Sequence, residues 1–90
     1  MKLKEEPKNK SVLTTSYVLC NDSPVTYVVY DEDGDWQLFG DEEFNDDDEP
    51  YLVSVDEILE MDSALRKLPD MQTGQAVYRQ KDSTRWFFEE

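Results

Sequence analysis

The chain has 90 residues and a formal net charge of −13 at pH 7, with nine Lys and Arg against 22 Asp and Glu. This length suits one domain that buries about 60–65% of the surface of its unfolded chain, so we expect one modest core. Such an acidic surface repels phosphate backbones and anionic lipid. It therefore excludes direct binding to nucleic acid or to a membrane, and it favours a basic protein partner.

The first ten residues, MKLKEEPKNK, are polar and carry four of the nine basic side chains. Because no apolar stretch follows, they are not typical of a signal peptide. We expect residues 1–10 to be a flexible N-terminal tail on a single domain of residues 11–90. Cys20 is the only cysteine, so no internal disulfide can form, which fits a reducing cytoplasm. Its neighbours Val18 and Leu19 predict a buried structural thiol.

Two strands are predicted after the tail. The segments 12–20 and 25–30 are rich in β-branched and aromatic residues, and turn-forming residues lie between them at 21–24. Because this connection is short, we expect an antiparallel hairpin. The second segment is apolar at nearly every position, which predicts a central place in the sheet.

A third strand is predicted at 36–39, after an acidic turn at 31–35 in which Gly34 supplies a positive φ. An acidic loop follows and leads to a short extended segment at 51–53. Trp36 lies in a strand pattern and is predicted to be a core residue.

A helix is predicted to begin after Ser54, which forms a capping box with Glu57. Asp62 and Ser63 are expected to interrupt it and to cap a second short helix, which ends before Pro69. Four apolar residues at helical spacing share one face and are predicted to lie in the core: Ile58, Met61, Leu65 and Leu68.

The segments 76–80 and 85–89 predict a closing hairpin, with Trp86 in the core. The order of three strands, a helical stretch and two strands is typical of an α+β fold. We expect an antiparallel sheet of about five strands with one or two short helices packed on one face.

Catalysis by side chains is not expected. The chain has no His, which removes the commonest general base and every zinc pattern of Cys and His. Its three Gly form no motif that would cradle a phosphate. Carboxylates in a solvated loop make poor general acids. We therefore expect a protein that is not an enzyme and that holds no cofactor.

The run of acids from 31 to 35 also suggests calcium. Asp31, Asp33, Asp35 and Glu42 fall at the oxygen positions of a calcium loop, but Trp36 stands where an EF-hand needs Gly. An EF-hand is therefore excluded and a β-turn is favoured. We assign no metal site, and weak binding of a divalent cation by these four carboxylates stays open.

The segment 31–49 holds 11 acids and no base. Such runs are usually solvated surface, and the alternative is a surface that docks a basic protein, with Phe44 as an apolar anchor. The candidate partner-binding residues are Asp41, Glu42, Glu43, Phe44, Asp46, Asp47, Asp48 and Glu49.

The run YDEDGDWQLFG at 30–40 resembles the HDxDGDWQF-like signature of a family of short bacterial proteins of unknown function. Tyr30 stands where that family usually has His, and Ser63 where it usually has Pro. The string Trp–Phe–Gly–Asp–Glu is also remotely similar to immunity domains that neutralise secreted bacterial toxins. The resemblance extends over about 12–88, with three further matching pieces: VSVDEIL at 53–59, DSAL at 62–65 and GQAVYR at 74–79.

The resemblance implies a bacterial cytoplasmic protein with no established activity. Together with the charge, it suggests a non-catalytic binding module that masks a basic partner, as an immunity protein would. The alternatives are a domain that binds divalent cations through 31–49, or an interaction protein of unknown role. The sequence does not indicate an oligomeric state.

Overall fold

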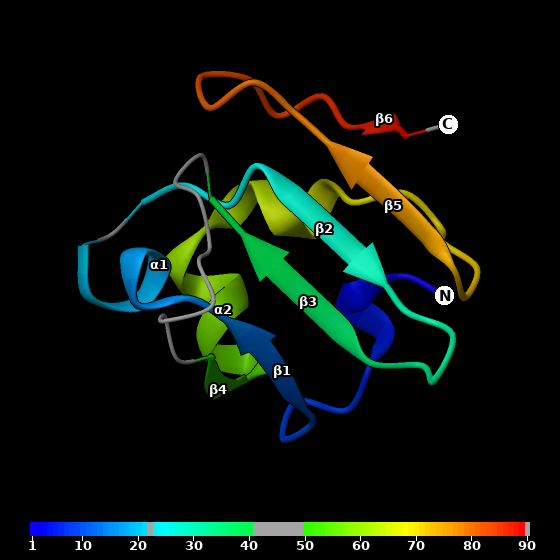
Figure 1. Cartoon of the computed structure of the whole chain (residues 1–90), viewed down its shortest axis with the longest axis horizontal. Helices are drawn as coiled ribbons and strands as arrows, with labels where there is room; N and C mark the ends of the chain where they lie inside the picture. The colour runs from blue at the N-terminus through cyan, green and yellow to red at the C-terminus, as the bar shows by residue number, and fades with distance from the viewer. Residues whose placement is uncertain (22, 41–49, 90) are drawn as a thin grey trace.

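A computed structural model describes residues 1–21, 23–40 and 50–89, which form one β-sheet with helices against it (Figure 1). The α+β class expected from the sequence is confirmed. None of the helices in these ranges is long and apolar enough to cross a membrane. The elements in chain order are η1 (Leu3–Glu5), β1 (Ser11–Thr14), α1 (Ser16–Asn21), β2 (Tyr27–Tyr30), β3 (Trp36–Phe39), β4 (Tyr51–Ser54), α2 (Val55–Met61), η2 (Ser63–Lys67), β5 (Gln75–Tyr78) and β6 (Phe87–Phe88).

The sheet has six strands in the order β4-β1-β3-β2-β5-β6, where about five antiparallel strands were expected. The additional strand is β4, the short extended segment, which pairs along its whole length with β1. β1 and β3 are parallel, and the other neighbouring strands are antiparallel. The sheet is therefore mixed rather than purely antiparallel.

Helix α1 is the reason for the parallel pair. The predicted hairpin between 12–20 and 25–30 is wrong, because the chain leaves the sheet after β1 and forms α1. Thr15 Oγ1 accepts a hydrogen bond of 3.4 Å from the backbone N–H of Val18, which caps the start of this helix. Val18 is buried, but Cys20 is exposed, so the expectation of a buried thiol is also wrong.

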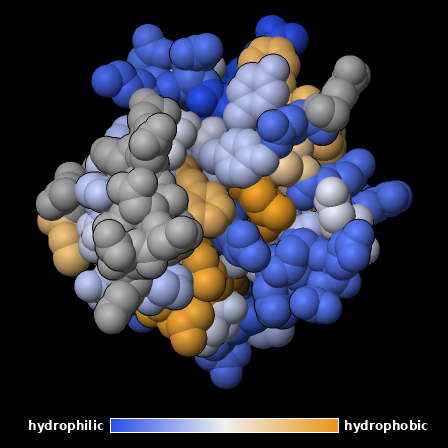
Figure 2. Space-filling model, viewed as in Figure 1, coloured by the Kyte–Doolittle hydropathy of each residue, from blue (hydrophilic) through white to orange (hydrophobic). Residues whose placement is uncertain are grey.

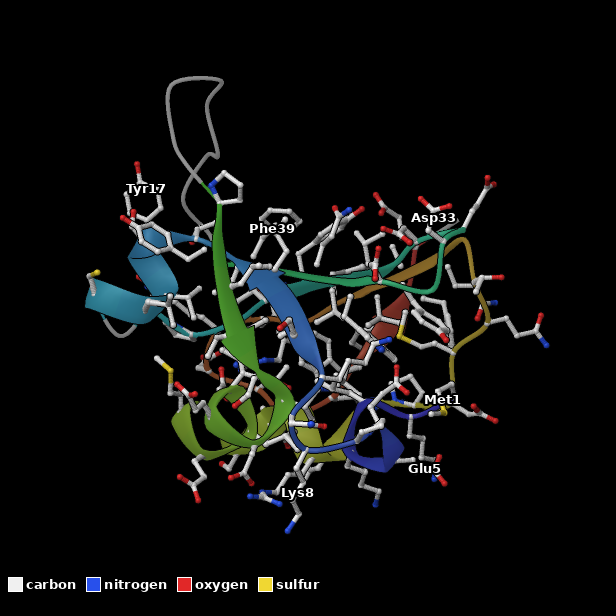
Figure 3. All side chains as sticks on the ribbon, turned by 90° about the horizontal axis from the view of Figure 1, so that it is seen from below. Met1, Glu5, Lys8, Tyr17, Asp33 and Phe39 are labelled. Atoms are coloured by element: carbon white, nitrogen blue, oxygen red, sulfur yellow. The ribbon has the colours of Figure 1, made fainter. Side chains whose placement is uncertain are left out.

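The core lies between the sheet and a layer made by η1, α2 and η2. Figure 3 shows this layer beneath the sheet, with Lys8 on the helical side and Phe39 on the opposite side. Ser54 caps α2 by accepting from the Glu57 backbone N–H, as predicted. The Glu57 carboxylate accepts from the Ser54 hydroxyl rather than from the Ser54 backbone N–H, so the predicted capping box is only half formed. Among the buried side chains are Val12, Val28, Trp36, Leu38, Val53, Ile58, Leu65, Leu68 and Val77.

One residue of the predicted helical stripe lies outside the core. Met61 is 42% exposed, because α2 ends there and the chain turns into η2, which interrupts the helical spacing. Asp62 begins η2 by accepting from the Ala64 backbone N–H, as expected. Trp86 is only partly buried and packs against the edge of the core.

The segment 1–10, expected to be a flexible tail, packs against the domain instead. Leu3 is fully buried among the core residues. The indole N–H of Trp36 donates to Glu6 at 2.8 Å, and Lys10 lies 3.6 Å from the same carboxylate. The backbone carbonyl of Lys10 accepts from the N–H of Val55. The tail is held because it supplies an apolar side chain to the core and an acceptor to a buried indole.

Candidate binding face of the sheet

The candidate site is the face of the sheet that points away from the helical layer. Side chains alternate along a strand, so the neighbours of Val12, Val28, Leu38 and Val77 point to this second face. No described helix covers it (Figures 1 and 3). We call it the open face, and the strand register places on it Leu13, Tyr27, Val29, Gln37, Phe39, Leu52, Ala76, Tyr78 and Phe87.

An aromatic row crosses one end of the open face. Tyr27 lies opposite both Phe39 and Tyr78, and Tyr78 lies opposite Phe87. The ring centroids are 6.4 Å apart for Tyr27 and Phe39, and 5.9 Å apart for Tyr78 and Phe87. Tyr78 and Phe87 are each 43% exposed. Large aromatic side chains that remain in solvent together are typical of binding surfaces.

Aliphatic side chains form the other part of the open face. Leu13 lies opposite Leu52, and Leu52 is 72% exposed, although it occupies a sheet position. Val29 lies opposite Ala76 on the far side of Gln37. Figure 2 views this face and shows hydrophobic atoms gathered over the sheet, with hydrophilic side chains at its margin. The face is thus mainly apolar, with Gln37 between Leu13 and Val29 and with polar side chains at the rim, as interfaces have.

A hollow of about 240 Å³ lies at the edge of the open face, between β1, β3, β4 and the turn that precedes β3. Leu13 and Leu52 form its apolar wall, and Asp31, Asp35 and Gln37 form its polar wall. Ser11 and Trp36 complete the lining. The hollow therefore combines aliphatic contact with acidic groups.

The Asp31 carboxylate organises the turn between β2 and β3. Its Oδ1 accepts from the backbone N–H groups of Asp33 at 2.9 Å and Asp35 at 3.0 Å, and its Oδ2 accepts from Gln37 Nε2 at 3.3 Å. Gly34 adopts a φ of +83°, which favours glycine. The predicted β-turn is confirmed, and it gives Asp31 a structural role.

The calcium candidates do not form a described metal site. Within residues 1–21, 23–40 and 50–89, no three side chains of His, Cys, Asp or Glu come together in a group that could hold a metal ion. The fourth candidate, Glu42, lies outside these ranges. The same holds for all the candidate partner-binding residues: Asp41, Glu42, Glu43, Phe44, Asp46, Asp47, Asp48 and Glu49.

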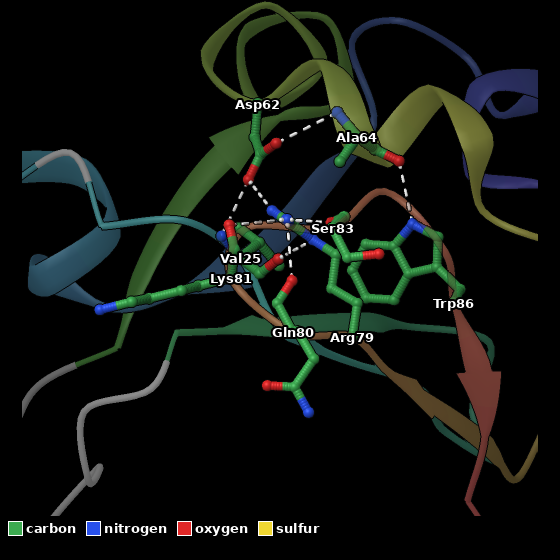
Figure 4. Close-up of polar contacts among 8 residues, drawn as sticks. All are labelled: Val25, Asp62, Ala64, Arg79, Gln80, Lys81, Ser83 and Trp86. Carbon is green, nitrogen blue, oxygen red and sulfur yellow. Dashed lines mark hydrogen bonds and ion pairs between the residues drawn. The ribbon is translucent and has the colours of Figure 1, made fainter.

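A second polar cluster, which the sequence did not indicate, surrounds Arg79 (Figure 4). Its Nη2 donates to Asp62 Oδ2 at 2.8 Å, and its Nε donates to the carbonyl of Val25 at 2.8 Å. Its Nη1 donates to three carbonyls in the turn before β6, of which that of Ser83 is closest at 2.6 Å. The guanidinium also lies 5.3 Å from the ring centroid of Trp86. Because these donors are engaged within the chain, the cluster holds the fold together rather than binding a ligand.

Among the described residues, contacts with residues near the chain ends perturb two titrating groups. Tyr27 donates its hydroxyl hydrogen bond to Glu89, which raises the pKa of Tyr27, and burial and the negative charge of Glu89 add to this. The ammonium group of Met1 donates to Asp70, and this contact lowers the pKa of that exposed carboxyl group. Neither shift places a general acid or base near neutral pH.

Comparison of the chain with protein-family models, with curated proteins and with solved structures finds no significant match. The resemblance to short bacterial proteins and to immunity domains therefore stays an expectation from the motifs. Inference about function depends on the geometry of the described residues.

Proposed function

We propose that this protein is a non-catalytic binding module whose open face docks a basic segment of a partner protein. The open face carries the proposal, because it leaves Leu52, Tyr78 and Phe87 exposed and Leu13, Tyr27 and Phe39 partly exposed on a sheet whose other face is buried. Apolar side chains grouped in this way are typical of protein interfaces.

Charge complementarity supports a basic partner. The net charge of −13 attracts cationic chains over long range, and it repels a second copy of the same chain. Acidic side chains also border the face itself, where Asp31 and Asp35 lie beside Leu13 and Leu52. A segment that presents both basic and apolar side chains would satisfy the rim and the middle of the face together. This is the chemistry expected for a protein that masks a basic surface.

The test uses a short peptide of alternating arginine and leucine residues, with a matched peptide in which glutamate replaces arginine. We expect the basic peptide to shift the NMR signals of Leu13, Val29 and Leu52 while those of Ile58, in the core, stay unchanged. Binding should weaken as salt rises, because exposed charges are screened. The glutamate peptide should not bind.

Substitutions locate the contact. Tyr78→Thr is expected to weaken binding by about tenfold, since an exposed aromatic that becomes buried in an interface often contributes more than 1 kcal/mol. Met61→Thr is the matched control, because Met61 is about as exposed as Tyr78 but lies at the end of α2, outside the open face. Equal losses from the two substitutions, or equal binding of both peptides, would overturn the proposal. Self-association that Leu52→Thr abolishes, without any peptide binding, would assign the face to a second copy and would also overturn it.

A further inference from the structure

We propose that the hollow beside Leu13 and Leu52 receives an arginine side chain of the partner, an inference that rests on the proposed function and names its anchor. The hollow has about 240 Å³, which is the volume of about eight water molecules. It opens at the edge of the open face, so a segment lying across the sheet could place one side chain in it.

The polar wall of the hollow offers acceptors. The Asp35 carboxylate receives no hydrogen bond from any described residue, although its backbone N–H is used by the turn. Asp31 uses three of its roughly four lone-pair positions within the chain, which leaves one at Oδ2. Gln37 donates its Nε2 to Asp31, so its carbonyl oxygen remains as an acceptor.

The donors that line the hollow are largely engaged. The indole N–H of Trp36 donates to Glu6, and the amide of Gln37 donates to Asp31. A ligand that fits must therefore supply several donors and positive charge, which a guanidinium does with five N–H groups in one plane. An anionic ligand would meet carboxylates without a basic side chain in the lining.

The apolar wall fits the rest of an arginine side chain. Leu13 and Leu52 are cross-strand partners and both line the hollow, with Leu13 partly buried and Leu52 exposed. Arginine buries its methylene stem along such surfaces while its charged end reaches polar groups. A bare metal ion would gain nothing from the leucines, and the described carboxylates do not gather around one point.

The experiment isolates the side chain from the rest of the partner. N-acetyl-arginine amide is titrated into the protein and followed by NMR, with N-acetyl-citrulline amide as the neutral control of nearly the same shape. We expect the arginine compound to shift the signals of Leu13, Gln37 and Leu52, and to bind about two- to fivefold more tightly than citrulline, as an exposed ion pair allows.

Paired variants of the turn identify the carboxylate. Asp35→Asn should weaken binding of the arginine compound by about two- to fivefold, because Asp35 lines the hollow. Asp33→Asn is the matched control, since Asp33 is exposed in the same turn but does not line the hollow. Each substitution keeps the backbone N–H group that donates a hydrogen bond to the Asp31 carboxylate.

The outcomes separate this inference from the proposed function. If the basic peptide binds the open face but citrulline equals arginine, or Asp35→Asn equals Asp33→Asn, the arginine site is refuted and the binding face stands. If neither the peptide nor the arginine compound binds, both proposals fail. If arginine binds with shifts confined to residues outside the hollow, the site is again refuted.

Discussion

The substitution Arg79→Met tests how far the fold depends on one buried cation. The Arg79 side chain is 4% exposed and that of Asp62 is 15% exposed, and their atoms lie 2.8 Å apart. The guanidinium joins β5 to the junction of α2 and η2, and it also holds the turn before β6 (Figure 4). Methionine is unbranched and apolar, so the substitution removes the charge and the donors while it keeps most of the volume.

The expected loss in the free energy of unfolding is about 3–5 kcal/mol, because removal of one partner leaves the other as an unpaired, largely buried charge. Four carbonyl groups also lose their donor: those of Val25, Gln80, Lys81 and Ser83. At roughly 0.05–0.15 kcal/mol per residue, a chain of 90 residues has about 5–13 kcal/mol in total. The variant should therefore lose about a quarter or more of its stability.

Urea denaturation followed by Trp fluorescence measures this loss. Arg85→Met is the matched control, because the Arg85 side chain makes no hydrogen bond or ion pair with a described residue and lies only over the ring of Phe87. This substitution should cost less than about 1 kcal/mol. Adding Asp62→Asn to Arg79→Met should restore about 1–2 kcal/mol, since the amide keeps an acceptor and removes the unpaired charge. A loss for Arg79→Met no larger than that of the control would refute the reasoning.

Two further predictions concern the chain ends. Leu3→Ala should lower the free energy of unfolding by about 2–5 kcal/mol, because Leu3 is fully buried. Lys4→Ala is the control and should have little effect, because Lys4 is exposed. Equal urea midpoints for the two variants would contradict the packing of residues 1–10. The raised pKa of Tyr27 stabilises the fold fully below pH 10.0, its usual value, and this contribution is lost as pH rises through the folded pKa. Absorbance titration should therefore lose a late-titrating phenol in Tyr27→Phe, and an unchanged curve would refute the contact with Glu89.

The local elements that the sequence predicts best are those with a cap or a turn residue. The N-cap at Ser54 requires only the backbone N–H three residues further on, and the turn at Gly34 requires only a backbone that tolerates positive φ. Each interaction is complete within a few residues, so no knowledge of the rest of the chain is needed. These elements lie where the sequence places them.

The pairing of strands depends on contacts that the sequence does not display. Residues 16–20 have the same β-branched and aromatic character as β1, and only the Thr15–Ser16 pair marks the helix start. Propensity over so few residues is a weak guide, and burial of Val18 decides the outcome. Once α1 replaces a hairpin, β3 can lie between β1 and β2.

The candidate site was only partly visible in the sequence. The acidic turn is evident in the sequence, but its hollow depends on Leu13 and Leu52, which are far apart in the chain and meet only when β4 pairs with β1. The apolar character of 25–30 on both faces predicts a central strand, and β2 is an interior strand of the sheet. It also signalled that the second face is apolar, although no described helix covers it.

Under the proposed function, the apolar open face and the negative net charge have complementary roles. An exposed aromatic row such as that around Tyr78 would favour association between copies if the chain were near neutral. At −13, repulsion between like charges opposes the approach of two copies, whereas a basic segment is attracted. The net charge of the protein then determines which partners approach, and the leucines and aromatic rings form the contact with them. Because electrostatic attraction governs the approach and apolar side chains form the contact, salt should affect mainly the rate of association. Tyr78→Thr should affect mainly the rate of dissociation.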